Sequence, residues 1–419
     1  LVRSRGLGDV YKRQLLREDA TAVKARLATR TGNYSDLIDQ VLACDARRRE
    51  SETRVQHLRA EKNRLSKEIG GLKKSGTDSS GLEAQVKGFS DEMEELGRTA
   101  AELDAEQRNL LLQIPNLPAP GLPEGREAAD NVAIRHWGEP GPSNPEDHVA
   151  IGERLGLFDL DRAAKISGSG YVLFTGAGAR LERSLINFLL DLQTRSHGYT
   201  EIAPPVLVRR ECMEGTGQLP KFEDDMYGFD GGASFLTPTA EVSVTNIRRE
   251  EILAESELPL KYTACTPCFR REAGSAGRET RGMIRMHQFD KVELVKICTP
   301  DQAAAELESL TADAEKVLQL LQLPYRVLAL CTGDIGFSSC RTYDLEVWAP
   351  GQGSYLEVSS CSHFGDYQAR RMNLRYKDAN GKNQFCHTLN GSGTALARLY
   401  VALLETLSLI HISEPTRPY

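Results

Sequence analysis

The sequence predicts an α+β fold, in which an antiparallel β-sheet flanked by helices follows an N-terminal antiparallel pair of long helices. Two observations indicate this fold. Apolar residues recur every seven positions over residues 34–72 and again over 82–114, which is typical of coiled-coil helices. Strand-like segments then recur without long helices between them, at 325–331, 343–349, 354–360 and 371–376. That spacing favours an antiparallel sheet over a parallel one.

The seven-residue repeat defines the seam of each predicted helix. In the first segment nine of twelve seam positions are apolar or cysteine. They are Tyr34, Leu37, Val41, Cys44, Arg48, Ser51, Val55, Leu58, Lys62, Leu65, Ile69 and Leu72. The second seam runs from Leu82 to Ile114, and residues 73–81 between the segments have the Gly and Ser content of a turn. We therefore expect an antiparallel helical hairpin.

The two predicted helices differ in charge. Residues 45–74 contain ten Lys or Arg and five Asp or Glu, whereas residues 83–108 contain three and eight. One interpretation is an ordinary solvated coiled coil. The other is a basic face that binds a nucleic-acid backbone, with an acidic face turned away.

Composition limits the class of protein. A chain of 419 residues suggests two domains, and a hydrophobic content of 40% allows a sizeable core. No apolar run reaches the length of a membrane span, and the N-terminus lacks a secretory pattern. The nine cysteines are an odd number without framework spacing, so we expect reduced thiols and a cytoplasmic location.

The chain divides into five expected regions. Residues 1–14 have no clear amphipathic period and residues 407–419 follow a helical pattern abruptly, so we expect a non-native leader and tail. Residues 15–115 form the helical arm. Seven of the eighteen prolines lie at 115–145, so residues 116–145 are expected to be a stiff linker. Residues 146–406 form the sheet-containing domain.

The most informative stretch is residues 268–293, where two strand-like runs flank a loop rich in Gly and Arg. If the second run is a strand from Ile284 to Val295, its alternation places five residues on one side of the sheet: Arg285, His287, Phe289, Lys291 and Glu293. A cation, an aromatic ring and a carboxylate on one surface would suit a phosphate, a flat base and an ammonium group.

This stretch resembles motif 2 of the class II aminoacyl-tRNA synthetases, in the form found in bacterial seryl-tRNA synthetases. The resemblance covers about residues 15–405, and residues 198–205 resemble motif 1, which forms the dimer interface in the family. Further segments match in order: Gly217-Gln-Leu-Pro-Lys-Phe222, Thr237-Pro-Thr-Ala-Glu241, Glu357-Val-Ser-Ser360 and Thr388-Leu-Asn-Gly-Ser-Gly393.

The resemblance implies a serine–tRNA ligase, an enzyme that activates L-serine with ATP and transfers it to the 3′ end of tRNA(Ser), and by expectation also tRNA(Sec). It also implies a homodimer with a class II catalytic domain and an arm that grips tRNA. Double-stranded RNA is recognised largely through its shape and backbone, so a basic arm without aromatic residues is sufficient.

The resemblance also assigns the nucleotide site. Arg270 would bind the reacting carboxylate and the α-phosphate, Glu272 the adenine amino group, and Arg285 a phosphate. Phe289 and Arg398 would cover the two faces of adenine. The full ATP-binding set is Arg270, Arg271, Glu272, Arg285, Met286, Phe289, Glu357, Val358, Ser359, Ser360 and Arg398. The alternative for Arg270 and Glu272 is a surface ion pair, and for Phe289 a core aromatic residue.

Glu357 and Ser360 are the implied ligands of Mg²⁺, and Arg270, Arg285 and Glu357 the implied catalytic residues. A spacing of three puts Glu357 and Ser360 on opposite faces of a regular strand, so a bulge or the strand end must bring them together. Carboxylate and hydroxyl oxygens suit Mg²⁺. The implied serine-binding residues are Thr239, Ala240, Glu241, Arg270, Glu293, Asn390 and Ser392.

Other sites and functions are weaker. Cys265-x-x-Cys268 has no second pair, so we expect no structural zinc. Two rival functions remain: a relative that loads an amino acid onto a carrier protein, and a non-catalytic scaffold of the same fold. The long arm argues against the first, and the retained charged residues argue against the second.

Overall fold

The computed structural model describes residues 13–143, 146–273 and 282–413, with side chains up to residue 408. The chain forms two compact units. Among the described residues, the helical unit contains 13–28 and 32–114, and the sheet unit contains 29–31 and those from 115 onward. Most of the expected leader and the end of the expected tail lie outside the described residues, whereas Arg13 and Gln14 begin a helix.

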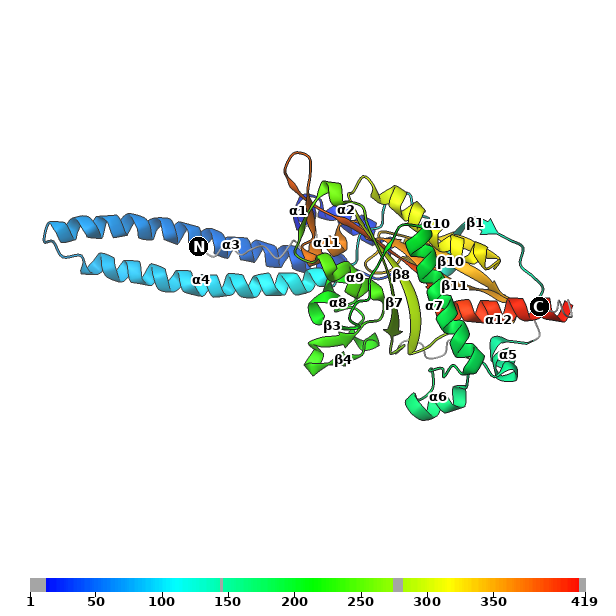
Figure 1. Cartoon of the computed structure of the whole chain (residues 1–419). Helices are drawn as coiled ribbons and strands as arrows, with labels where there is room; N and C mark the ends of the chain where they lie inside the picture. Colours follow the sequence, from blue (N-terminus) through cyan, green and yellow to red (C-terminus); the bar gives the residue numbers. More distant parts are fainter. Residues whose placement is uncertain (1–12, 144–145, 274–281, 414–419) are drawn as a thin grey trace. The chain divides into compact units, whose positions relative to one another are not determined.

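The helical unit contains the predicted antiparallel pair of long helices. Helix α3 (Ser35–Lys74) and helix α4 (Ser80–Leu112) lie side by side (Figure 1). Val41, Cys44, Leu58 and Leu65 are buried at predicted seam positions. At the start of α3 the prediction was wrong by one residue, since Ile38 rather than Leu37 is fully buried. Helices α1 (Arg13–Glu18) and α2 (Ala20–Leu27) also pack there, which changes the buried face.

Asp45 is a buried carboxylate within the helical unit. Its Oδ1 lies 2.6 Å from Nη2 of Arg17 and accepts a hydrogen bond of 3.1 Å from the Gln107 amide. Burial acts to raise the pKa of Asp45, but hydrogen bonds from Arg17, Gln107 and Arg48 outweigh it and hold that pKa well below its usual range. This carboxylate therefore links α1, α3 and α4.

The sheet unit is built on eight strands, and its neighbouring strands are antiparallel except for the parallel pair at one edge. This confirms the predicted antiparallel sheet. In sheet order the strands are β1 (Val132–Trp137), β9 (Tyr325–Ala329), β10 (Arg341–Ala349), β11 (Ser354–His363), β14 (His387–Ala395), β8 (Gln288–Cys298), β7 (Leu260–Phe269) and β2 (Thr200–Glu201).

Two stretches differ from expectation. Strand β1 lies within residues 116–145, where the sequence suggested only a linker, and it pairs with β9 at the sheet edge. Its six residues contain no proline, so the prolines on either side do not prevent pairing. The strand expected at 371–376 was wrong in part, because Arg371 and Met372 end helix α11 (Tyr367–Met372). Only β12 (Arg375–Lys377) follows, in a separate small sheet.

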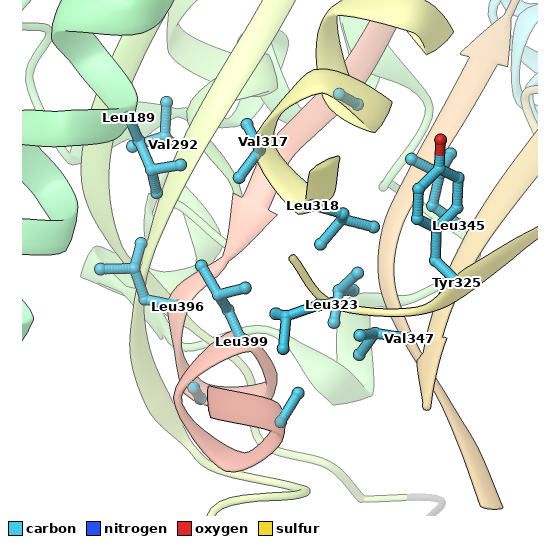
Figure 2. Packing of buried hydrophobic residues seen from close by; sticks show 14 of the residues in the cluster. Leu189, Val292, Val317, Leu318, Leu323, Tyr325, Leu345, Val347, Leu396 and Leu399 are labelled. Atoms are coloured by element: carbon cyan, nitrogen blue, oxygen red, sulfur yellow. The ribbon is translucent and has the colours of Figure 1, made fainter. Parts of the chain in front are cut away.

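The main core lies where three helices pack on the sheet (Figure 1). These helices are α7 (Gly176–Ser196), α10 (Ala303–Leu320) and α12 (Leu396–Ser413). Figure 2 shows side chains from these helices and from β8 and β10 gathered in this core, including Leu189, Val292, Val317, Leu318, Leu345, Leu396 and Leu399. The packing fixes the position of β8 and of the start of α12, both of which contribute residues to the site described below.

The remaining elements are short. Their helices are α5 (His148–Leu155), α6 (Leu160–Ser167), α8 (Arg210–Thr216), α9 (Ala240–Thr245) and five 3₁₀ turns. Strands β6 (Ile252–Ala254) and β13 (Asn383–Phe385) pair with β12, and β3 (Leu207–Arg209), β4 (Gly228–Phe229) and β5 (Ser234–Leu236) form a third sheet. Within the described ranges no helix combines the length and apolarity needed to cross a bilayer. All nine cysteines are described and none forms a disulfide.

Candidate active site

A pocket of about 300 Å³ lies against β8, β11 and β14. Its volume is at the lower end of the range typical of small-molecule sites. Most of the predicted site residues line it: Thr239, Glu241, Arg270, Glu272, Arg285, Met286, Phe289, Glu357, Val358, Ser360, Asn390, Ser392 and Arg398. Four do not. Ala240, Glu293 and Ser359 are buried beside it, and Arg271 is exposed.

Strand β8 begins later than the alternation predicted. It starts at Gln288, so the same-face prediction applies to Phe289, Lys291 and Glu293 and is wrong for Arg285 and His287. Gly282 precedes this part of the chain with a positive φ of 68°, and residues 282–287 form turns and bends. The amide of His287 donates to the carbonyl of Gly170 at 2.9 Å rather than to a continuing strand. Arg285 nevertheless lines the pocket, from a turn.

Arg270 occupies the middle of the pocket wall. It follows β7 directly, and its guanidinium carbon lies 5.2 Å from the ring centroid of Phe289 on the paired strand β8. Its Nε donates to the carbonyl of Pro238 at 3.4 Å. A guanidinium held against an aromatic face is stabilised by a cation–π interaction. Arg270 therefore bridges the 237–241 segment, predicted to bind serine, and the predicted adenine platform.

The other predicted nucleotide contacts form charge pairs around the rim. Nη1 of Arg285 lies 3.0 Å from Oε2 of Glu272. Glu272 has a φ of 50°, a left-handed conformation that is costly for a residue with a side chain. Arg398 donates from Nε to the carbonyl of Ile284 at 3.2 Å and from Nη1 to the carbonyl of Glu357 at 2.8 Å. These half-exposed cations are placed where a phosphate could replace a carboxylate or carbonyl partner.

A β-bulge brings Glu357 and Ser360 together, as the spacing predicts. On β10, Leu345 faces Ser359 and Glu346 faces Glu357, which leaves Val358 as the extra residue on β11. Glu357 and Ser360 consequently both line the pocket. The bulge turns a spacing of three into a shared face.

A buried carboxylate lies behind this pair. Asp344 faces Ser360 on β10, and the Ser360 hydroxyl hydrogen-bonds to it. Its Oδ1 is buried and has no hydrogen-bond partner among the described residues. Burial, and then the charge of Glu357, raise the pKa of Asp344 well above its usual range. A cation beside Glu357 and Ser360 would fit this acidic surrounding.

The residues suit a cation that keeps most of its own water. Within the described ranges, no group of three or more His, Cys, Asp and Glu side chains is placed to hold a metal. Glu357 and Ser360 can supply at most three oxygens to a shared ion. Such a sparse oxygen set matches Mg²⁺, which dehydrates reluctantly and takes phosphate oxygens as further ligands.

Glu293 lies behind the wall of the pocket rather than at its surface. Its side chain is 1% exposed, its Oε2 is 2.6 Å from Nζ of Lys291, and its Oε1 accepts a hydrogen bond of 2.8 Å from the Asn390 amide. Lys291 and Asn390 both line the pocket. Glu293 thus fixes the orientation of two side chains that a ligand would meet.

Glu241 is the second buried carboxylate on this side. The Gln368 amide donates to its Oε1 at 2.6 Å and to the carbonyl of Thr216 at 3.1 Å, and the Thr388 hydroxyl donates back to Gln368 at 2.6 Å. Complete burial, and then the charge of Glu293, raise the pKa of Glu241 to about 7. Gln368 therefore joins the 237–241 and 388–393 segments, which the sequence singled out separately, and Thr216, the residue before the 217–222 segment.

Sequence reasoning missed several residues of the site. The alternation placed Lys291 on the same face of β8 as Phe289 and Glu293, but Lys291 was given no role in the site. Gln218 lines the pocket within a segment that was recognised only as a motif. Gln368 has no local signal, because its partners are distant in sequence.

The Cys265-x-x-Cys268 pair and two neighbouring histidines lie outside the pocket lining. Nε2 of His363 lies 3.0 Å from Nδ1 of His387, on the adjacent strands β11 and β14. Burial, and then the neighbouring His387, lower the pKa of His363 to about 3. Cys265 lies on β7 and is half-buried, and Cys268 is fully buried on the same strand.

Comparison with known proteins agrees with this geometry. Residues 230–407 match the family model of the tRNA synthetase class II core domain (G, H, P, S and T), and residues 11–118 match that of the seryl-tRNA synthetase N-terminal domain. The serine–tRNA ligase of Akkermansia muciniphila is 59% identical over 97% of this chain and 96% of that protein. The Pelobacter propionicus serine–tRNA ligase is 50% identical over 97% of both.

A solved structure supports the same assignment. The crystal structure of seryl-tRNA synthetase from Pyrococcus horikoshii complexed with ATP matches with a TM-score of 0.89 and 36% identity. The match covers 94% of each chain. Together with the relatives above, it shows that this chain belongs to the seryl-tRNA synthetase family of class II aminoacyl-tRNA synthetases.

Proposed function

We propose that the chain is a serine–tRNA ligase, which converts L-serine and ATP to seryl-adenylate and pyrophosphate and then transfers the seryl group to the 3′ end of tRNA(Ser). The observation that carries this proposal is the position of Arg270, which contacts both the 237–241 segment and Phe289. One pocket therefore places a cation between a site for a small zwitterion and a site for a flat base.

In the first step a carboxylate oxygen of serine attacks the α-phosphorus of ATP, and pyrophosphate leaves. Arg270 and Arg285 would neutralise the negative charge that develops on the phosphate, while Phe289 and Arg398 hold the adenine. This is catalysis by alignment and electrostatic stabilisation, with no nucleophile from the protein. In the second step a terminal ribose hydroxyl of tRNA attacks the acyl carbon, and AMP leaves.

Glu357 and Ser360 would hold Mg²⁺, in keeping with the bulge at Val358 and the buried Asp344 behind it. When bound, the ion supplies positive charge to the phosphates. Arg398 donates a hydrogen bond to the backbone carbonyl of Glu357 and so helps to hold Glu357 in place. Arg398 thereby links the proposed metal ligand to the proposed adenine contact.

Serine would bind between Glu241, Asn390 and Ser392, with Thr239 and Ala240 shaping the wall. Two carboxylates, Glu241 and Glu293, serve the ammonium end, and Lys291 offsets part of their charge. A site that hydrogen-bonds a hydroxyl discriminates strongly against an analogue without one, since its polar groups would stay unpaired. We therefore propose that alanine is rejected.

For the helical unit we propose binding of tRNA, including tRNA(Sec), through the basic face of α3. Part of that charge is used within the hairpin, since Arg54 and Lys73 pair with Glu92 and Glu83 of α4 at 2.8 and 2.7 Å. Arg59, Lys67 and Lys74 are exposed and available to phosphates. The proposed bounds are residues 15–115 for the arm, 116–145 for the linker and 146–406 for the catalytic domain.

We also propose a homodimer and a cytoplasmic location. The dimer is supported by β2, which ends the large sheet as an unpaired edge within the motif 1 segment. The location is supported by nine cysteines without a disulfide. Sedimentation of the purified chain would test the dimer, and a monomer would contradict it.

The deciding experiment follows pyrophosphate exchange with ATP, Mg²⁺ and each amino acid in turn, and then charging of tRNA(Ser). Serine-dependent exchange with tRNA charging is expected. Exchange with transfer only to a carrier protein would favour the first rival function. Absence of exchange with every amino acid would favour the scaffold.

A further inference from the structure

His148 and Glu405 form a buried pair outside the pocket. His148 begins α5 and Glu405 lies on α12, and their side chains are 1% and 0% exposed. Nδ1 of His148 lies 3.0 Å from Oε1 of Glu405. The pocket lining includes neither residue. Burying a carboxylate is costly unless it is well hydrogen-bonded, so the pair needs a structural or functional reason.

The carboxylate of Glu405 is well supplied with donors. Besides the ring, it accepts hydrogen bonds from the backbone amide of His148 at 3.0 Å, the backbone amide of Gly351 at 2.9 Å and the side chain of Gln352 at 2.8 Å. It therefore ties α12 to the start of α5 and to the turn between β10 and β11.

The other ring nitrogen of His148 reaches the nucleotide side. The backbone amide of Met283 donates to Nε2 at 3.1 Å. A backbone amide can only donate, so Nε2 must accept and the ring proton lies on Nδ1, facing Glu405. The hydrogen bond to Met283 thus depends on the tautomer that Glu405 selects.

Two glycines are packed directly against this pair. A Cβ on Gly282 would lie 2.1 Å from Nε2 of His148, and one on Gly351 would lie 2.7 Å from the carboxyl carbon of Glu405. Neither contact could be made by a residue with a side chain without displacing the pair. The backbone at Gly282 therefore packs directly against His148, and the backbone at Gly351 packs directly against Glu405.

Met283 begins the stretch that enters the pocket wall. Residues 283–286 all line the pocket, and they include Arg285, which the proposed function places on a phosphate. Arg398 holds the middle of the same stretch through the carbonyl of Ile284 at 3.2 Å. At the N-terminal end of this stretch, the Met283 amide is held by its hydrogen bond to His148.

We propose that His148 and Glu405 are positioning residues for the ATP site: they anchor Met283 so that residues 283–286 present Arg285 to the phosphates. The inference rests on the proposed function and deepens it, since it assigns a role in ATP binding to two residues that touch no ligand. Loss of the anchor should weaken ATP binding and leave serine binding nearly unchanged.

Two substitutions at one position separate positioning from bulk stability. In His148→Gln the amide reaches the place of Nε2 and can still accept from Met283. In His148→Asn the shorter amide reaches only the place of Nδ1 and keeps the contact with Glu405. Tyr199→Phe is the control, because it removes a hydrogen bond of 2.8 Å to Asp313 and neither residue lines the pocket.

We expect His148→Asn to raise the KM for ATP in pyrophosphate exchange by roughly three- to tenfold, the size of one lost hydrogen bond. The KM for serine should change less than about twofold, because residues 283–286 include none of the proposed serine contacts. His148→Gln should retain most of the native KM for ATP, and Tyr199→Phe should lower stability without changing the ratio of the two KM values.

Hydrogen exchange provides a readout that does not depend on activity. The Met283 amide should exchange faster in His148→Asn than in His148→Gln or the native chain. Equal exchange and equal KM values for ATP in both variants would overturn the proposal. If both variants fail to fold, Gln352→Leu removes only an outer donor and should still raise the KM for ATP; an unchanged value would then overturn it.

Failure of this inference is distinguishable from failure of the proposed function. If the native chain shows no serine-dependent exchange, the proposed function fails, whatever the Met283 amide does. If the native chain is active and the variants match it, only the anchoring role fails.

Discussion

Asp344 and Ser360 face each other across β10 and β11, immediately after the bulge that turns Glu357 toward the pocket. The serine hydroxyl thus has a carboxylate behind it and the pocket in front. Because Asp344 lies behind Glu357 and Ser360, the acidic surroundings of this pair favour a cation beside it.

The proposed metal site is tested by Glu357→Gln. A contact to a charged group contributes about 1.5–3 kcal/mol, so the Mg²⁺ concentration for half-maximal pyrophosphate exchange should rise roughly 10- to 100-fold. Titration of exchange with Mg²⁺ measures this. Glu346→Gln is the matched control, because Glu346 lies opposite on β10 but pairs with Arg326 at 2.6 Å. Equal shifts in the two variants would contradict the assignment.

Glu293→Ala should abolish serine-dependent exchange while ATP still binds. The change leaves Lys291 and Asn390 without their shared partner, so kcat/KM for serine should fall by at least about 100-fold, as expected for a broken buried charge pair. Exchange kinetics and ATP titration measure the two effects. Glu293→Gln, which keeps an acceptor for Asn390, should lose less. Unchanged exchange in Glu293→Ala would refute the pocket assignment.

Glu241 should make stability fall as pH rises. Its pKa is about 7 in the folded chain and 4.5 as an ordinary group, so between these values the folded state binds the proton that the unfolded state has lost. The free energy of unfolding should therefore decrease by up to about 3 kcal/mol from pH 4.5 to pH 7 and stay level above.

The comparison that isolates Glu241 is chemical denaturation of native chain and Glu241→Gln across this pH range. The glutamine can still accept from Gln368 and does not titrate. The native-minus-variant difference should fall with pH, and a difference that is flat would show that Glu241 does not retain its proton.

Asp45 should have the opposite dependence in the helical unit. Its pKa is lowered in the folded state, so its contribution is present above its ordinary pKa and is lost as the pH falls through the lowered one. Asp45→Asn should cost about 1.5–3 kcal/mol at neutral pH, because the buried carboxylate loses its charge-assisted hydrogen bonds from the partly exposed Arg17 and Arg48. Circular dichroism during thermal unfolding measures this. Glu61→Gln, at an exposed ion pair with Arg64, should change little.

Charge reversal on the arm should affect tRNA alone. Lys67→Glu and Lys74→Glu remove exposed cations from α3, so each should weaken tRNA binding and reduce its dependence on salt by about one counterion. Lys87→Glu on the acidic helix α4 is the control and should have a smaller effect. Serine-dependent exchange without tRNA should be unchanged in all three. Equal loss from Lys87→Glu would argue that the arm has no basic binding face.

The sequence was most predictive where chemistry depends on local spacing. The spacing of Glu357 and Ser360 required a bulge, and the bulge is at Val358. The alternation of β8 placed Phe289 correctly but extended too far, because periodicity alone does not mark the turn that starts at Gly282. Strand β1 was missed because prolines on both sides dominate the composition of that stretch.

Contacts between distant segments had no such signal. Gln368 meets Glu241 across 127 positions, and His148 meets Glu405 across 257. No pattern within a window of the chain relates such partners, since only the folded backbone brings them together. For the same reason the sequence did not predict that Glu293 is buried, since its burial depends on neighbouring strands and not on its own strand.

The order of strands has a consequence for synthesis. Strand β14, the last made, lies between β11 and β8. While a ribosome is still translating, those two strands each lack a neighbour, and exposed strand edges invite aggregation. Both halves of the sheet must therefore keep an unpaired strand edge until β14 has left the ribosome. Chaperones that cover these unpaired strand edges should raise the yield of active enzyme more than conditions that only speed the initiation of translation.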